Sequence, residues 1–183
     1  MTFPNNFDSL HAITSGKHLY QFYKNSEDFL HVMIPYFDAG LAKGEACLWL
    51  VSKRNGFDLA RDTAEAMIPS FSAPHSLEQF QILPAEDWYL TEGVFDEAKA
   101  VRNAGNYLER VLKLGFSALR IAGDAGAVSR NDRPQFEAYE RKIMPWIKGR
   151  PVIALCAYPI LECTPSQAKT ILECHEDVLV GHF

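Results

Sequence analysis

The stretch ACLWLVS, residues 46–52, is apolar at six consecutive positions before it reaches Ser52. A strand with one face in water alternates apolar with polar residues, whereas a strand covered on both faces is apolar throughout. We therefore predict that this stretch is a buried strand of a parallel sheet. Four further short apolar runs favour additional strands, in residues 80–83, 117–123, 151–158 and 177–181.

Between these runs, apolar residues recur every three or four positions, as they do on the buried face of a helix. One pattern begins at Ser26, which can cap it, contains Pro35, where we expect a kink, and ends at Gly44. The other patterns cover residues 59–67, 101–112, 136–147 and 164–175, the last with a Thr cap and Pro at its first position. Alternating strands and helices predict an α/β fold: one three-layer domain with a mostly parallel sheet of five to six strands and helices on both faces.

Length and composition narrow the class of protein. A chain of 183 residues with 48% hydrophobic content is long enough for a single domain, here residues 1–183. Its net charge of −5 provides no basic field, so we expect no direct binding to nucleic acid. There is no apolar stretch of roughly 18 residues and no basic-then-apolar order at the N-terminus, so we expect no membrane association and a cytoplasmic protein.

The cysteines show no spacing typical of a metal knuckle. Cys47, Cys156, Cys163 and Cys174 contain no CxxC pair, and we expect free thiols. Cys156, Cys163, Cys174 and His175 are residue types that bind zinc, but their gaps match no compact site and Cys156 lies in an apolar run. We therefore predict no bound metal, and a buried thiol at Cys156 rather than a nucleophile.

Ligands of such sheets bind at the carboxyl ends of the strands, where helix N-termini point outward. The residues that follow the apolar runs are polar and aromatic: Ser52, Lys53, Arg54, Glu86, Asp87, Trp88, Tyr89, Asp124 and Tyr158. The loops VSKRNGFD and GDAGAVSRN lack the Gly-Lys-Ser or Gly-Lys-Thr ending of a phosphate loop, which disfavours nucleotide hydrolysis. Arg120 interrupts an apolar run, and an unpaired buried guanidinium would be costly. We expect it either to form a structural ion pair, with Asp124 or Glu86 as partner, or to contact a ligand.

Six motifs in order resemble the MEDS domain, the methanogen/methylotroph DcmR sensory domain, over residues 16–181. They are GKHLYQFY, GLAKGEACLWLV, AEDWYLTEGVFD, GFSALRIAGD, VIALCAY and HEDVLVG. The resemblance implies a RecA-like α/β fold without a working phosphate loop. It also implies sensing of small organic compounds such as hydrocarbon derivatives, often beside a DNA-binding or kinase module. Tyr20 stands where relatives often carry a cysteine, which argues against thiol-based or metal-based sensing here.

These observations favour a small-molecule sensory domain that is not an enzyme, uses no cofactor, and regulates transcription or signalling through a signalling or DNA-binding partner protein. Homo-oligomerisation stays open. We expect no catalytic residue and the following ligand-binding residues: His18, Tyr23, Glu86, Trp88, Tyr89, Arg120, Asp124, Cys156 and Tyr158. One alternative is a degenerate RecA-like nucleotide-binding protein or enzyme with Glu45, Glu86 or Asp124 as acid or base. Another is an interaction module with a vestigial pocket, in which the aromatic rings only fill the core.

Overall fold

The computed structural model describes residues 8–69, 71 and 76–179. Its centre is a six-stranded sheet, with every neighbouring pair parallel, in the order β3-β2-β6-β7-β1-β8. The strands are β1 (Lys17–Tyr23), β2 (Ala46–Val51), β3 (Phe80–Pro84), β6 (Leu119–Asp124), β7 (Val152–Pro159) and β8 (Asp177–Val178). The predicted parallel sheet is confirmed, and the strand predicted over residues 177–181 is shorter, with Val180 and Gly181 outside the described residues.

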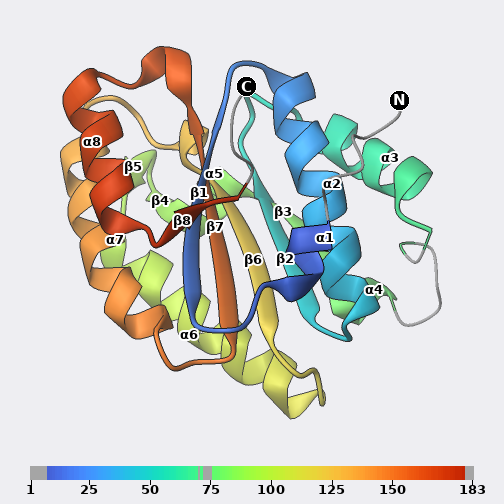
Figure 1. Ribbon diagram of the computed structural model, residues 1–183. Helices are drawn as coiled ribbons and strands as arrows, with labels where there is room; N and C mark the ends of the chain where they lie inside the picture. Colours follow the sequence, from blue (N-terminus) through green and yellow to red (C-terminus); the bar gives the residue numbers. More distant parts are fainter. Residues whose placement is uncertain (1–7, 70, 72–75, 180–183) are drawn as a thin grey trace.

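Helices cover both faces of the sheet, which confirms the three predicted layers (Figure 1). One face carries α1 (Asp8–Ala12), α2 (Ser26–Ala42) and α3 (Phe57–Met67). The other carries α5 (Ala85–Tyr89), α6 (Glu97–Lys113), α7 (Arg133–Ile147) and α8 (Pro165–Cys174). The remaining elements are short: α4 (Ser76–Gln79), the hairpin β4 (Leu90–Thr91) and β5 (Val94–Phe95), η1 (Ala125–Ala127) and η2 (Ile160–Glu162).

Local sequence signals account for the helix ends. The side chain of Asn25 accepts a hydrogen bond from the backbone of Asp28, so Asn25 rather than Ser26 caps α2, and Gly44 follows its end with a φ of 70°. The side chain of Thr164 caps α8 in a reciprocal pair with Gln167, as predicted for this Thr. The hairpin β4–β5 was not predicted, since its strands have only two residues each.

The alternation of side chains along each strand divides the core into two halves. On one face, Leu19 of β1 and Trp49 of β2 pack against α2. On the other face, Leu48 of β2 and Cys156 of β7 pack with residues of α5, α6 and α7. Strand β1 lies between β7 and β8, so the first described strand of the chain has the last two as neighbours.

The helices of the described residues can be checked for a membrane-spanning segment. No helix in the described ranges combines the length and the apolar composition needed to cross a bilayer. The N-terminal residues 1–7, where a leader was judged absent, lie outside the described residues.

Candidate functional site

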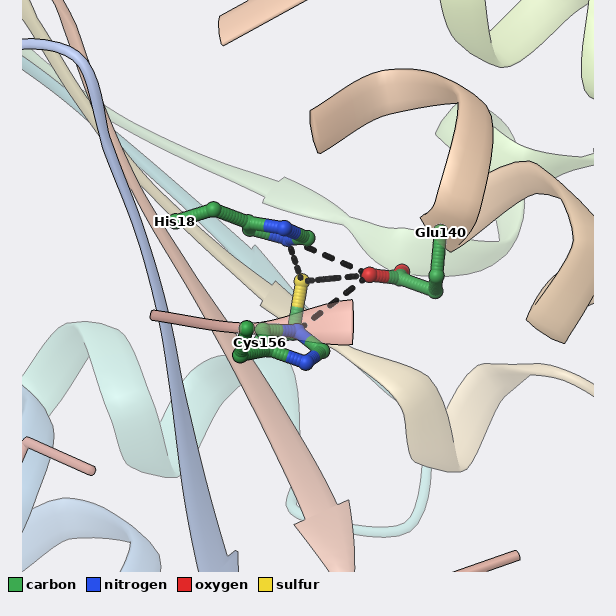
Figure 2. Close-up of side chains that lie close together, drawn as sticks. His18, Glu140 and Cys156 are labelled. Atoms are coloured by element: carbon green, nitrogen blue, oxygen red, sulfur yellow. Dashed lines mark hydrogen bonds and ion pairs between the residues drawn. The ribbon is translucent and has the colours of Figure 1, made fainter. Parts of the chain in front are cut away.

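Four polar side chains meet in the buried layer between the sheet and α7. They are His18 of β1, Glu140 of α7, Cys156 of β7 and His175, which follows α8. Each of the four residues is at most 8% exposed. The Oε2 atom of Glu140 lies 3.2 Å from His18 Nε2, 3.3 Å from His175 Nε2 and 3.5 Å from Cys156 Sγ. Figure 2 shows His18, Glu140 and Cys156 pointing toward one another from three elements. We call these four residues the polar cluster.

Backbone carbonyls hold both imidazoles of the polar cluster in a defined orientation. His18 Nδ1 lies 3.2 Å from the carbonyl oxygen of Cys174, and His175 Nδ1 lies 2.7 Å from that of Ile171. A carbonyl oxygen only accepts hydrogen bonds, so each Nδ1 carries a proton and donates it. The Nε2 atoms therefore face the interior of the cluster, and the two rings lie with their centroids 4.0 Å apart.

Burial and charge act differently on the two acidic groups of the polar cluster. Burial alone would raise the pKa of the Glu140 carboxyl, but the adjacent imidazoles of His175 and His18 outweigh it and lower the pKa to about 2. Burial, with the neighbouring carboxylate of Glu140, raises the pKa of the Cys156 thiol well above its usual range. Glu140 is thus ionised, and the thiol of Cys156 is protonated and donates toward it.

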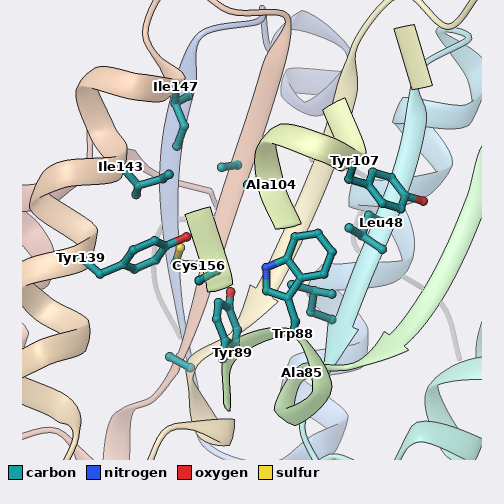
Figure 3. Close-up of a cluster of buried hydrophobic side chains, with 14 of the residues drawn as sticks. Leu48, Ala85, Trp88, Tyr89, Ala104, Tyr107, Tyr139, Ile143, Ile147 and Cys156 are labelled. Atoms are coloured by element: carbon teal, nitrogen blue, oxygen red, sulfur yellow. The ribbon is translucent and has the colours of Figure 1, made fainter. Parts of the chain in front are cut away.

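A cavity of about 40 Å³ borders the polar cluster. Its walls are mostly apolar and come from the sheet, α5, α6 and α7, and its polar groups include Tyr89, Tyr139, His18, Glu140 and Cys156. In Figure 3, Tyr139, Ile143 and Ile147 project from α7 toward the side of Tyr89 and Cys156. The volume exceeds the roughly 10–15 Å³ that one water molecule needs. This space, which we call the central cavity, therefore has room for a molecule of a few heavy atoms.

A second space of about 10 Å³ lies between α7 and α8. Tyr158, Cys174 and His175 line it, and Glu140 lines both spaces. The hydroxyl of Tyr158 is buried and has no hydrogen-bond partner among the described residues. Members of the polar cluster thus line both small spaces, which lie on the same side of the sheet.

The structure brings together only part of the predicted ligand-binding set. His18, Trp88, Tyr89 and Cys156 line the central cavity, and Tyr158 lines the smaller space. The remaining four predicted residues line neither of the two spaces: Tyr23, Glu86, Arg120 and Asp124.

Tyr23 and Asp124 belong to a hydrogen-bond network at the carboxyl ends of β1 and β6. The carboxylate of Asp124 accepts hydrogen bonds from Tyr23 Oη at 2.8 Å, from Ser52 Oγ at 2.5 Å and from Asn55 Nδ2 at 2.7 Å. The backbone N–H groups of Ser52 and Gly126 also donate to it. Tyr23 packs in the half of the core that faces α2, away from the polar cluster. This network satisfies Asp124 with protein groups alone.

Arg120 is held in a buried ion pair with Glu45, so the predicted partners Asp124 and Glu86 were wrong. Its Nε lies 2.5 Å from the carboxylate of Glu45, and its guanidinium lies 4.9 Å from the ring centre of Tyr36. The alternation of β6 turns Arg120 toward α2, and Glu45 just precedes β2, the neighbour of β6. Of the two explanations offered for Arg120, the structural ion pair thus has a defined partner in Glu45. Glu86, for its part, accepts a hydrogen bond from the backbone N–H of Lys53.

Sequence reasoning missed Glu140 and did not group His175 with His18. A signal for Glu140 was present, because it follows Phe136 by four residues and precedes Ile143 by three, which places a charged residue on the apolar stripe of α7. A carboxylate at such a position must find polar partners inside the core. The stripe indicates that such partners exist but does not identify them, since they come from distant strands.

Comparison with known proteins identifies one family model and several distant solved structures. The family model described as MEDS: MEthanogen/methylotroph, DcmR Sensory domain matches residues 17–176. No curated protein matches the chain. A solved structure of arginase from Entamoeba histolytica, in complex with L-ornithine, aligns with a TM-score of 0.44 and 11% identity over 92% of this chain and 71% of that one. A similarity of this size carries no argument about activity.

Proposed function

Because this chain belongs to the MEDS family of sensory domains, we propose that it senses a small organic compound that binds in the central cavity, and that it signals through a partner protein. The observation that carries the proposal is this cavity, whose walls are mostly apolar but include the polar side chains of His18, Glu140 and Cys156. Pockets of this kind use apolar walls for affinity and a few polar groups for orientation.

The size of the central cavity limits the class of ligand. Sites for drug-sized molecules and cofactors measure roughly 300–1,000 Å³. At about 40 Å³, the central cavity fits a compound of a few heavy atoms without large rearrangement. A short hydrocarbon chain with one polar group, such as an alcohol, an aldehyde or a halide, matches both the size of the cavity and its mostly apolar lining with a few polar groups.

The wall of the central cavity offers a route for the signal. Tyr139, Glu140 and Ile143 all belong to α7, which is part of the outer helical layer. A ligand between α7 and the sheet would change how this helix packs, because close-packed cores respond to added volume by shifting whole elements. A partner protein that contacts the outer surface of α7 or α8 would then register occupancy.

The enzyme alternative has less support, since two of its three candidate acids, Asp124 and Glu45, are engaged elsewhere, and the third, Glu86, does not line the central cavity. Asp124 accepts five hydrogen bonds within its network. Glu45 is paired with Arg120, and both are buried. A general acid or base must reach a proton of its substrate, and neither carboxylate borders the central cavity.

A substitution that fills the central cavity tests the proposal. Ala104 of α6 lines the cavity, whereas Ala98 on the same helix is exposed, so Ala104→Leu and Ala98→Leu form a matched pair. We would screen the unmodified chain by calorimetry and melting temperature against alcohols, aldehydes and halides of one to three carbons. A compound that binds the unmodified chain and Ala98→Leu but not a folded Ala104→Leu would support the proposal. No binding by any of these compounds, or equal binding by both variants, would contradict it.

A further inference from the structure

We propose that the polar cluster of His18, Glu140, Cys156 and His175 binds one divalent transition-metal ion, for which zinc is the best match. Zinc takes imidazole nitrogen, thiolate sulfur and carboxylate oxygen as ligands, and structural zinc sites are almost always four-coordinate. The inference concerns the cluster itself and does not depend on the identity of the sensed compound.

The distances in the polar cluster match a tetrahedral site. Metal–ligand bonds of 2.0–2.3 Å at tetrahedral angles separate the ligand atoms from one another by about 3.3–3.6 Å. His18 Nε2 lies 3.2 Å from Glu140 Oε2 and 3.4 Å from Cys156 Sγ, while His175 Nε2 lies 3.3 Å from Glu140 Oε2. All four ligand atoms lie within 4.8 Å of one another. Small side-chain rotations are sufficient to place them around one ion.

The orientation of the imidazoles is the second observation that points to a cation. Each histidine of the cluster donates its Nδ1 proton to a backbone carbonyl, which is the outer-shell arrangement typical of metal-binding histidines. With Nδ1 protonated, the neutral ring leaves the lone pair of Nε2 facing the interior of the cluster, and this is the form in which an imidazole binds a metal. His175 Nε2 is fully buried and makes no hydrogen bond among the described residues. A cation between these atoms would accept both Nε2 lone pairs and the carboxylate of Glu140.

Metal binding would change the protonation of Cys156. The thiol now donates to Glu140, and coordination replaces the S–H bond with an S–metal bond while the proton leaves to solvent. With two nitrogens, one sulfur and one oxygen, the protein supplies all four ligands. Closed sites of this kind stabilise a fold, and here the ion would connect β1, α7, β7 and the residue after α8.

This proposal replaces the expectation, drawn from cysteine spacing, that the chain binds no metal. That expectation considered Cys163 and Cys174 as companions of Cys156. Here, Cys163 lies outside the cluster, and Cys174 contributes its backbone carbonyl to the orientation of His18. The ligand set comes from four separate elements, which spacing rules for compact knuckles do not describe.

The test uses the complete chain without an affinity tag, because tags bind metals. We would remove metal with a chelator, titrate zinc against a chromophoric chelator, and titrate Co²⁺ while recording absorption. The expected result is about one ion per chain and a thiolate-to-cobalt charge-transfer band. Cys156→Ser should abolish the band and weaken zinc binding more than about 100-fold, which exceeds the effect of losing an outer-shell group. Cys163→Ser, a cysteine outside the cluster, is the matched control and should retain both.

A readout on the unmodified chain keeps the test decisive if a variant fails to fold. Adding zinc should slow hydrogen exchange of the backbone amides of α8, because His175 would be tied to the sheet. The proposal is overturned if the chelated chain takes up neither zinc nor cobalt, or if Cys156→Ser binds as the unmodified chain does. Ala104→Leu should bind zinc normally, so failure of the ligand proposal and failure of the metal proposal are separate results.

Discussion

Removing one partner of the buried pair between Arg120 and Glu45 should destabilise the fold strongly. Arg120 is 0% exposed and Glu45 is 3% exposed, and their contact measures 2.5 Å. Glu45→Gln leaves the guanidinium without a counter-charge, and breaking such a pair costs about 3–5 kcal/mol of unfolding free energy. In a domain of this size, about 1 kcal/mol shifts the melting temperature by roughly 2–4 °C, so we expect a decrease of roughly 6–20 °C.

The assay is urea unfolding followed by circular dichroism, applied to Glu45→Gln, Arg120→Gln and the double variant. The double variant should lose less stability than the sum of the two single variants, because it leaves no unpaired buried charge. Glu97→Gln, which breaks a surface pair with Lys142, is the matched control and should cost less than about 1 kcal/mol. If Glu45→Gln costs no more than Glu97→Gln, the buried pair does not hold the core together. If folded Arg120→Gln instead loses only the response to ligand, Arg120 belongs to the site.

Two further substitutions test the division between the faces of the sheet. Gly123→Ala places a Cβ atom 2.1 Å from the hydroxyl of Tyr89, so it should displace this ring and weaken ligand binding. We expect it to reduce the free energy of unfolding by about 1–3 kcal/mol, as measured by thermal melting. The control is Gly105→Ala, in open space on α6, which should not destabilise the fold. Tyr23→Phe removes a hydrogen bond to the carboxylate of Asp124 and should reduce the free energy of unfolding by about 1.5–3 kcal/mol. Ligand affinity measured by calorimetry should not change. A loss of affinity without loss of stability would place Tyr23 in the ligand site.

The layers of the fold were predictable because the apolar runs are short, continuous and separated by helical periods. The residues that make up the site were less predictable from the sequence, although the alternation of side chains along a strand would have placed some candidates on opposite faces of the sheet. His18 and Tyr23 are five residues apart on β1, and an odd separation places them on opposite faces. Alternation could not show that β1 pairs with β7 rather than with β2, which follows it in the chain. The order of strands depends on tertiary packing, and it decides that His18 meets Cys156.

Glu140 illustrates a different limit of sequence reasoning. Its position on the apolar stripe of α7 indicates a buried carboxylate, but its partners lie on β1, on β7 and after α8. No local spacing rule connects residues drawn from such distant parts of the chain. The same limit applies to Arg120, whose partner Glu45 precedes the neighbouring strand.

The position of β1 between β7 and β8 has a consequence for biosynthesis. During translation, residues 17–23 leave the ribosome long before residues 152–159, with which they pair. Until then β1 has neither of its neighbours, and pairing across so long a segment is intrinsically slow. The polar cluster assembles only when β1, α7, β7 and His175 are all in place, so a nascent chain or one truncated before His175 has no complete site.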